Sequence, residues 1–215
     1  MIKGIIFDLD GVLVSTDEMH YLAWKRLADE LGITGFNRED NRRQRGVSRM
    51  ASLEVVLEKS DKTYTEEEKT ELAERKNGYY LELLKEMDNS AVLTGVYEAL
   101  EVLKRRNLLL AVGSASKNAP VILEKTGLLP YLNQVSCGLD TTKSKPDPEV
   151  FLVAARKLQL DPAQCLVVED SAAGIEAAKA GGMRSLAVGP FFQSLGGDFA
   201  APSLGEVANW DEVLA

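Results

Sequence analysis

The amino-acid sequence predicts an α/β protein, in which a doubly wound parallel sheet of the Rossmann type is interrupted by an inserted helical domain. Two observations support this fold class. From residue 92 onward, short apolar segments alternate with segments of helical periodicity, which is typical of a parallel sheet with helices on both faces. Residues 16–88 contain helical patterns only, and they follow a single apolar segment at residues 2–7. That first segment must join the later strands, so the helices between them form an insertion.

The first predicted strand ends in two acids, Asp8 and Asp10. A strand as apolar as residues 2–7 is expected to be covered on both faces. Because side chains alternate along a strand, the two acids project to the same side, and Gly11 permits a tight turn after them. Taken alone, the pattern also fits a surface turn. Two carboxylates at the end of a buried strand instead favour a ligand site that includes a cation.

The sequence Ser15-Thr16-Asp17-Glu18 marks the start of the inserted segment, residues 16–88. This sequence fits a capping box with Ser15 as the N-cap and Glu18 reaching back to it. The helix that follows is expected to stop at Gly32. Ser48 is expected to cap a second helix through Leu57, and a capping box at residues 65–68 opens a third helix through about residue 87. We therefore expect a core domain of residues 1–15 and 89–215 and a helical cap domain of residues 16–88.

The elements of the core follow in regular order after residue 92. We expect helices at residues 96–105, 119–126, 148–158 and 171–180, and strands at residues 108–112, 134–136, 165–168 and 185–188. Gly127 and the pair at 181–182 terminate two of these helices, and a proline opens the third. Residues 196–215 are weakly patterned, and we expect them to form a covering loop and an edge strand.

The overall composition limits the possible partners. The 215 residues are 45% hydrophobic, and 25 Lys and Arg against 33 Asp and Glu give a net charge of −8. This charge argues against nucleic acid or an anionic membrane as a partner. The two cysteines, Cys137 and Cys165, are expected to be reduced and inert. The early acids interrupt the first apolar stretch, so we expect no signal peptide, and no apolar run is long enough to span a membrane. We expect a cytoplasmic protein that is a monomer.

Three further strand ends carry polar side chains. Ser114 opens a loop of small residues before a helix, which suits an anion but also fits an ordinary N-cap turn. Lys145 precedes a helix stiffened by prolines, although a solvated lysine is an alternative. Glu169 and Asp170 follow another apolar strand, where Asp170 could also cap the next helix. Together the four strand ends predict a site in which acids bind a hard cation, Mg²⁺, and Ser114 and Lys145 contact phosphate oxygens.

These motifs resemble those of the haloacid dehalogenase superfamily of phosphotransferases. The resemblance covers residues 1 to about 190 and rests on Asp8-Leu9-Asp10-Gly11-Val12, Ser114, Lys145-Pro146 and Glu169-Asp170. It is greatest to the mutases that interconvert β-glucose 1-phosphate and glucose 6-phosphate through β-glucose 1,6-bisphosphate. The features shared with those mutases are His20, Arg45-Gly46-Val47-Ser48-Arg49, Ser52, Arg75-Lys76-Asn77 and Ser114-Ala115-Ser116-Lys117-Asn118. Two positions depart from the pattern: Ser15, where relatives usually have Asp, and Arg45, where a lysine is often found.

The resemblance implies a role for each group of residues. Asp8 would be the nucleophile that forms an aspartyl phosphate, and Asp10 the general acid and base. The metal ligands would be Asp8, the main-chain carbonyl of Asp10, Asp170, and Glu169 directly or through water. Ser114 and Lys145 would offset charge on the transferring phosphoryl group. The substrate-binding residues would be Thr16, His20, Arg45, Gly46, Val47, Arg49, Ser52, Lys76, Ala115, Ser116, Lys117 and Asn118.

Three functions compete at this stage. A mutase must bind two phosphates, and Arg49 with residues 116–118 would hold the one that does not react. A sugar-phosphate phosphatase needs no such second anion site. A non-catalytic phosphosugar-binding protein is the third reading, and the intact Asp8 and Asp10 argue against it. Two cap residues also have simple structural alternatives. His20 could be an ordinary histidine on a helix surface, and Lys76 could lie on a solvated helix face. We expect Tyr21 and Trp24 to pack within the cap.

Overall fold

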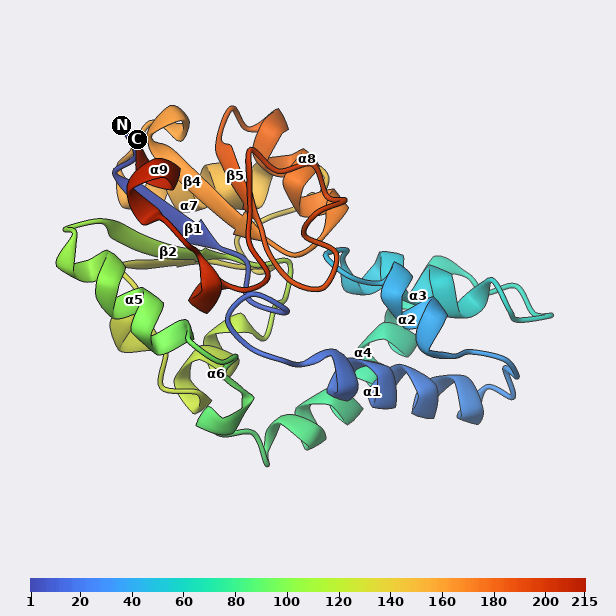
Figure 1. Ribbon diagram of the computed structural model, residues 1–215. Coiled ribbons are helices and arrows are strands. Elements are labelled where there is room, and N and C mark those ends of the chain that lie inside the picture. Colours follow the sequence, from blue (N-terminus) through green and yellow to red (C-terminus); the bar gives the residue numbers. More distant parts are fainter.

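The computed structural model describes residues 1–215 and contains one six-stranded parallel sheet in the order β3-β2-β1-β4-β5-β6 (Figure 1). The first apolar segment supplies the central strand β1, which pairs with β2 on one side and β4 on the other. The confirmed fold class is therefore a doubly wound α/β sheet. The strands are β1 (Gly4–Phe7), β2 (Leu109–Gly113), β3 (Gln134–Ser136), β4 (Cys165–Glu169), β5 (Arg184–Ala187) and β6 (Phe199–Ala200).

The alternation of side chains along β1 explains why the sheet is covered on both faces. Ile5 and Phe7 pack into a large core with helices α5 and α6, whereas Ile6 packs into a smaller core with α7 and α8. All three side chains are fully buried. These two apolar faces are the reason a near-continuous hydrophobic strand is stable at the centre of the molecule. The covering helices are α5 (Val96–Arg105), α6 (Ala119–Lys125), α7 (Glu149–Leu158) and α8 (Ala172–Ala180).

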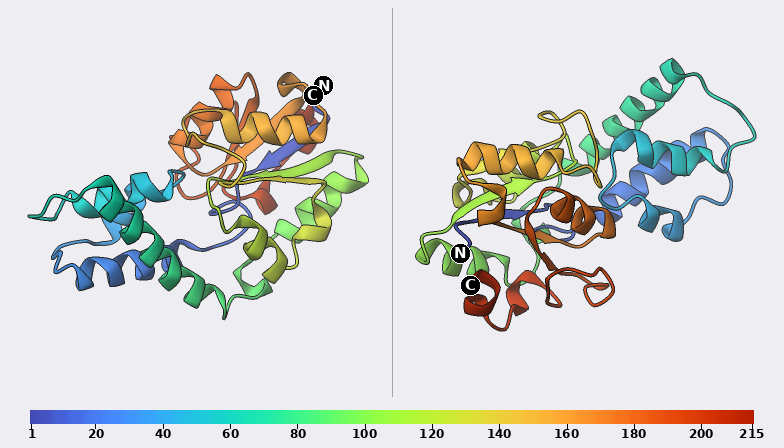
Figure 2. Two further views of the ribbon diagram at one scale, coloured as in Figure 1. Left: turned by 180° about the vertical axis from the view of Figure 1, so that it is seen from behind. Right: turned by 90° about the horizontal axis from the view of Figure 1, so that it is seen from above.

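Four of the five α-helices between β1 and β2 form a separate group beside the carboxyl edge of the sheet, which we call the cap (Figures 1 and 2). Its own apolar core includes Trp24, Leu27 and Leu53. The two chain passages that join it to the rest of the molecule pair with each other, since the Ser15 N–H donates to the carbonyl of Ala91 over 2.8 Å. The cap helices are α1 (Asp17–Glu30), α2 (Arg38–Arg43), α3 (Arg49–Leu57) and α4 (Glu66–Leu84).

The capping signals that begin the cap helices have different outcomes. Ser48 caps α3 by accepting from the Ala51 N–H over 3.2 Å, and the box at Thr65 and Glu68 forms with both of its hydrogen bonds. The predicted box at Ser15 is wrong, because the N-cap of α1 is Thr16 and it makes no side-chain cap bond. The Thr16 hydroxyl donates to Asp10 instead.

The chain after β5 departs further from expectation. The predicted edge strand exists as the short β6, which pairs with β5. The sequence pattern did not predict the helix α9 (Trp210–Leu214), whose N-cap Asn209 accepts from the Asp211 N–H over 3.0 Å. Both chain ends lie side by side, and the Ile2 N–H donates to the Leu214 carbonyl (Figure 1). Four short 3-10 turns, Asn89–Ala91, Leu129–Tyr131, Pro162–Gln164 and Leu204–Glu206, complete the connections. None of the helices has the length and apolar character needed to cross a membrane.

Candidate active site

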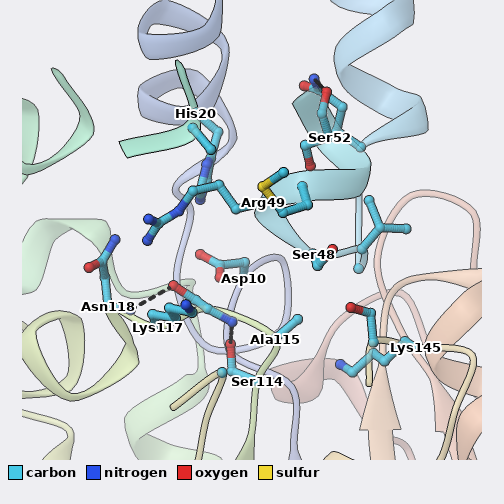
Figure 3. Close-up of a pocket in the computed structure, with 18 of the residues that line it drawn as sticks. Asp10, His20, Ser48, Arg49, Ser52, Ser114, Ala115, Lys117, Asn118 and Lys145 are labelled. Carbon is cyan, nitrogen blue, oxygen red and sulfur yellow. Dashed lines mark hydrogen bonds between the residues drawn. The ribbon is translucent and has the colours of Figure 1, made fainter. Parts of the chain in front are cut away.

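A cavity of about 550 Å³ lies between the cap and the carboxyl edge of the sheet (Figure 3). Its floor comes from the ends of β1 and β2 and from the loop before α7, and its roof comes from α1, α3 and α4. Fifteen of the predicted catalytic and binding residues line it: Asp8, Asp10, His20, Arg45, Gly46, Val47, Arg49, Ser52, Lys76, Ser114, Ala115, Ser116, Lys117, Asn118 and Lys145. Thr16, Glu169 and Asp170 do not line it.

The centre of the floor is a buried ion cluster. The Lys145 ammonium donates to Asp8 Oδ1 over 2.5 Å and to Glu169 Oε1 over 2.6 Å, and its side chain is fully buried. Burial lowers the pKa of Lys145, but the charges of Asp8 and Glu169 outweigh that effect and raise the pKa above its ordinary value. Lys145 is therefore a permanent cation beside Asp8, and the solvated-lysine alternative is wrong.

Both carboxylate oxygens of Glu169 are used in hydrogen bonds, one to Lys145 in this cluster and the other to Ser171 at the start of α8. Its second oxygen, Oε2, accepts from the Ser171 N–H over 2.7 Å and from the Ser171 hydroxyl over 2.8 Å. Ser171 is also the N-cap of α8, where its hydroxyl accepts from the Gly174 N–H. The alternative that Asp170 caps this helix is thus wrong, and the Asp170 carboxylate has no capping bond to make.

Negative charge exceeds positive charge around Asp8. Burial raises the pKa of Asp8 to about 7, with further increases from Glu169 and Asp10. Burial likewise raises the pKa of Asp170 to about 8, and the neighbouring Glu169 and Asp8 add to the effect. Asp170 lines a second cavity of about 380 Å³ that also reaches Thr16. Two buried carboxylates that cannot both ionise easily form a site that a cation would stabilise.

The donor set determines which cation would fit. No three His, Cys, Asp or Glu side chains are arranged to hold a metal ion together. Magnesium does not need such a group, because it keeps several waters and binds through one or two carboxylates and phosphate oxygens. Asp8, whose second oxygen is not bonded to Lys145, and Asp170 supply two such carboxylates. The residues present therefore fit Mg²⁺ better than a metal that requires a full protein cage.

Asp10 lies at the junction of the core and the cap. It accepts a hydrogen bond from Thr16, the N-cap of α1. Burial is the main reason the pKa of Asp10 is raised, and the Thr16 hydrogen bond acts in the opposite direction. A carboxyl with a raised pKa in a cavity is suited to give and take a proton. Because its partner belongs to α1, the orientation of Asp10 depends on the position of the cap.

A second group of polar residues lies away from Asp8. The loop after β2 is organised by two hydrogen bonds, from the Ser116 N–H to Ser114 Oγ and from the Asn118 N–H to Ser116 Oγ, each over 3.1 Å. These bonds leave Lys117 exposed on the cavity wall. Arg49, the first residue of α3, extends from the cap toward Lys117 and Asn118 (Figure 3). The facing cations and amides form a site suited to an anion.

His20 and Lys76 are paired on the roof of the cavity. The Lys76 ammonium lies 2.9 Å from His20 Nδ1, and the His20 ring stacks on Tyr80 at 4.2 Å between centroids. Burial lowers the pKa of His20 well below its ordinary value and that of Lys76 to about 7, and the Arg49 charge contributes to both shifts. Lys76 is 3% exposed, so the solvated-face alternative is wrong. Trp24 packs in the cap core, as expected, and also lines the cavity.

The segment before α3 brings the cap close to the core. Arg45 forms ion pairs with Asp17 of α1 and, at 3.7 Å, with Asp170 of the core. Gly46 has a φ of +72°, and a Cβ atom at this position would lie 2.5 Å from Ser171 Oγ. Only glycine fits both conditions without strain. Arg45 and Gly46 are thus the points at which the cap approaches the core above the β4 end.

Several residues that line the cavity were given no role from the sequence, and three of them make contacts that shape it. Asn77 accepts a hydrogen bond from the Asn118 amide over 2.9 Å, which links α4 of the cap to the start of α6. Glu74 and Asp17 pair with the two cavity arginines, Arg49 and Arg45. Helical spacing on α4 could have found two of them, because residues 70, 73, 74 and 77 share one face. Asp17 gave no signal beyond its acidic character.

The comparisons with known proteins agree with this architecture. The family model of haloacid dehalogenase-like hydrolases matches residues 2–182, and the chain belongs to this family of enzymes. A β-phosphoglucomutase of Bacillus subtilis is 40% identical over 198 residues, which cover 91% of this chain and 87% of that protein. A crystal structure of β-phosphoglucomutase from Clostridium difficile superposes with a TM-score of 0.91 at 35% identity, covering 99% and 96% of the two chains. A phosphatase of phosphorylated carbohydrates from Thermotoga maritima is 32% identical over 187 residues, or 86% and 83% of the two chains.

Proposed function

We propose that this chain is a β-phosphoglucomutase, which interconverts β-D-glucose 1-phosphate and glucose 6-phosphate through β-glucose 1,6-bisphosphate. The observation that carries the proposal is a cavity with two groups of anion-binding residues. Lys145 bonds to Asp8, and Ser114 follows β2, the strand next to the one that carries Asp8. Arg49 of the cap faces Lys117 and Asn118 of the core. A bisphosphate intermediate needs both groups, because one phosphate reacts while the other is held. The names of the similar proteins from Bacillus subtilis and Clostridium difficile support the same activity.

Asp8 is the proposed nucleophile. Phosphorylated Asp8 would transfer its phosphoryl group to the 6-hydroxyl of β-glucose 1-phosphate, which forms the bisphosphate and frees Asp8. Attack of Asp8 on the phosphorus at the other end would then release glucose 6-phosphate and restore the aspartyl phosphate. Asp10 would give a proton to the departing oxygen and take one from the attacking hydroxyl. Lys145 would offset the charge on the phosphoryl oxygens, which is the main requirement in such a transfer. The permanent charge of Lys145 and the raised pKa of Asp10 support these assignments.

Mg²⁺ is the proposed cofactor. Asp8, Asp170 and the main-chain carbonyl of Asp10 would hold it, with Glu169 acting through Lys145 and water rather than as a direct ligand, since both its oxygens already accept hydrogen bonds. A bound Mg²⁺ would neutralise charge on the phosphoryl oxygens. It would also favour the ionised form of Asp8, whose pKa burial and neighbouring acids raise.

The cap is proposed to exclude water during the transfer. A phosphoaspartate exposed to water would be hydrolysed, so a mutase must close its cavity around the sugar. The contacts that would hold the closed arrangement are those between Asn77 and Asn118 and between Arg45 and Asp170. His20 and Lys76 would then line the sugar site next to Asp10.

The alternative is a sugar-phosphate phosphatase, which the similarity to the Thermotoga maritima phosphatase favours. The deciding experiment supplies pure β-glucose 1-phosphate, Mg²⁺ and a trace of β-glucose 1,6-bisphosphate. Formation of glucose 6-phosphate without free phosphate is the result expected of the mutase. Stoichiometric release of glucose and phosphate would establish the phosphatase and overturn the proposal.

A further inference from the structure

The two arginines that line the cavity from the cap are each paired with an acid that lines the same cavity. Arg49 Nη1 lies 2.6 Å from Glu74 Oε1, and Arg45 pairs with Asp17. Lys76, the third cap cation in the cavity, has a histidine and two aromatic rings as neighbours instead of an acid. The residue proposed to hold the distal phosphate is therefore occupied by a carboxylate of its own domain.

The two members of the Arg49 pair differ in exposure. The Arg49 side chain is 18% exposed, whereas that of Glu74 is 61% exposed. Glu74 can swing into water with little loss, because its carboxylate is already largely hydrated. Arg49 remains in the cavity, where its charge lowers the pKa of both His20 and Lys76. A phosphate that arrives can thus displace Glu74 while the guanidinium stays in place.

We propose that Glu74 is an internal anion that competes with the distal phosphate of the substrate for Arg49. This inference rests on the proposed function in taking Arg49 as the distal phosphate site. Glu74 pairs with the guanidinium whenever the phosphate leaves it. The charge of the largely buried Arg49 side chain is therefore never left without a partner. In a mutase the two phosphates must exchange positions, and a partner for the vacated arginine makes that exchange easier. Glu74 therefore weakens substrate binding and speeds release.

The test compares Glu74→Gln with Glu58→Gln. Glu58 pairs with Arg43 on the cap over 2.7 and 2.8 Å and is also half exposed, but it does not line the cavity. Inorganic phosphate is titrated into each variant by calorimetry, alone and in an Arg49→Gln background. Glu74→Gln should tighten phosphate binding roughly two- to fivefold, as expected for a partly exposed ion pair, and Glu58→Gln should leave it unchanged. With β-glucose 1-phosphate, KM should fall by a similar factor while kcat stays constant or decreases.

The increase in phosphate affinity that Glu74→Gln produces must disappear when Arg49 is also replaced. If Glu74→Gln binds inorganic phosphate with an affinity equal to or lower than that of wild type, the proposal is overturned. Glu74 would then either have no effect on phosphate binding or position Arg49 for phosphate. A gain that persists with Arg49→Gln would overturn it as well, because Glu74 would then act through the general field of the cavity. These measurements do not depend on whether the enzyme isomerises or hydrolyses its substrate, so they distinguish failure of this inference from failure of the proposed function.

Discussion

Asp8 shows how burial and neighbours set the chemistry of a single residue. Burial raises the pKa of Asp8 to about 7, although Lys145 acts to lower it. The sequence placed Asp8 at a strand end beside Asp10, and strand alternation was sufficient to predict that both face one cavity. The sequence did not predict that both oxygens of Glu169 are used by Lys145 and Ser171. That outcome depends on side-chain directions in the loop before α7 and at the end of β4, which no local pattern specifies.

Asp8→Asn should abolish turnover of β-glucose 1-phosphate while the fold survives. The amide cannot form an acyl phosphate, and loss of the nucleophile in covalent enzymes costs on the order of 10⁴-fold or more. Lys145 keeps Glu169 as a partner, so the buried ammonium is not left uncompensated. Turnover and thermal denaturation of the purified variant provide the measurement. Substantial residual turnover by a folded protein would remove Asp8 as the nucleophile.

The lowered pKa of Lys76 leads us to expect that the free energy of unfolding depends on pH. Burial, with Arg49 nearby, lowers its pKa in the folded state to about 7, whereas an unfolded lysine titrates near about 10.4. Between these values the unfolded chain binds more protons, so the free energy of unfolding rises with pH by at most about 1.4 kcal/mol per pH unit. The destabilisation is complete below pH 7 and disappears toward pH 10. Lys76→Met should remove it.

Urea denaturation of wild type and Lys76→Met at several pH values between 6 and 10 isolates this contribution. The variant should have its greatest stability advantage at pH 6 to 7, and the two free energies of unfolding should converge as the pH rises. Parallel curves would show that Lys76 is not held with a lowered pKa. The comparison cancels the titrating groups that do not contact Lys76, because both proteins share them; His20, whose pKa the Lys76 charge lowers, does not cancel.

At the scale of elements, capping residues predicted where α3 and α4 begin, failed at α1 for a clear reason, and were not recognised at Asn37, the N-cap of α2. Ser48 and Thr65 bond to their own helices as expected. The box at Ser15 did not form, because the Thr16 hydroxyl bonds to Asp10 and Glu18 pairs with Arg38. Local capping rules cannot anticipate partners 6 and 20 residues away. The short helix α9 escaped prediction because five residues give too little periodicity.

Ser48→Ala tests the link between the start of α3 and the cavity. Loss of the N-cap should destabilise the protein by about 1 kcal/mol and loosen the first turn, which contains Arg49. Thr65→Ala is the matched control, because it removes an N-cap from α4 more than one helical turn before Thr70, the first residue of that helix that lines the cavity. Both variants should lose similar stability in urea denaturation, but only Ser48→Ala should raise KM. An equal change in KM would contradict the assignment of Arg49 to substrate.

At the scale of the whole molecule, the sequence indicated the two parts but not how they meet. The alternating pattern after residue 92 and the helical insertion predicted the fold class, and the strand-end motifs predicted the floor of the cavity. The contacts between the parts, Asn77 with Asn118 and Arg45 with Asp170, join residues 41 and 125 positions apart, so periodicity gave no sign of them. The roof residue whose chemistry depends most on this arrangement is Arg49, since it is useful only when the cap lies over the core.

Arg49→Ala should separate the two leading functions. Truncation removes a charge-assisted contact to the distal phosphate and weakens closure, so isomerisation of β-glucose 1-phosphate should fall by orders of magnitude, equivalent to about 2–5 kcal/mol. Phosphorylation of Asp8 by a small acyl phosphate should change little, because that donor carries one phosphate and does not reach Arg49. Arg49→Lys should recover part of the loss, since an ammonium keeps the charge without the guanidinium fork. The ratio of the two activities in one variant cancels partial misfolding. Equal losses would make Arg49 structural, and no loss in either activity would leave the phosphatase as the better supported function.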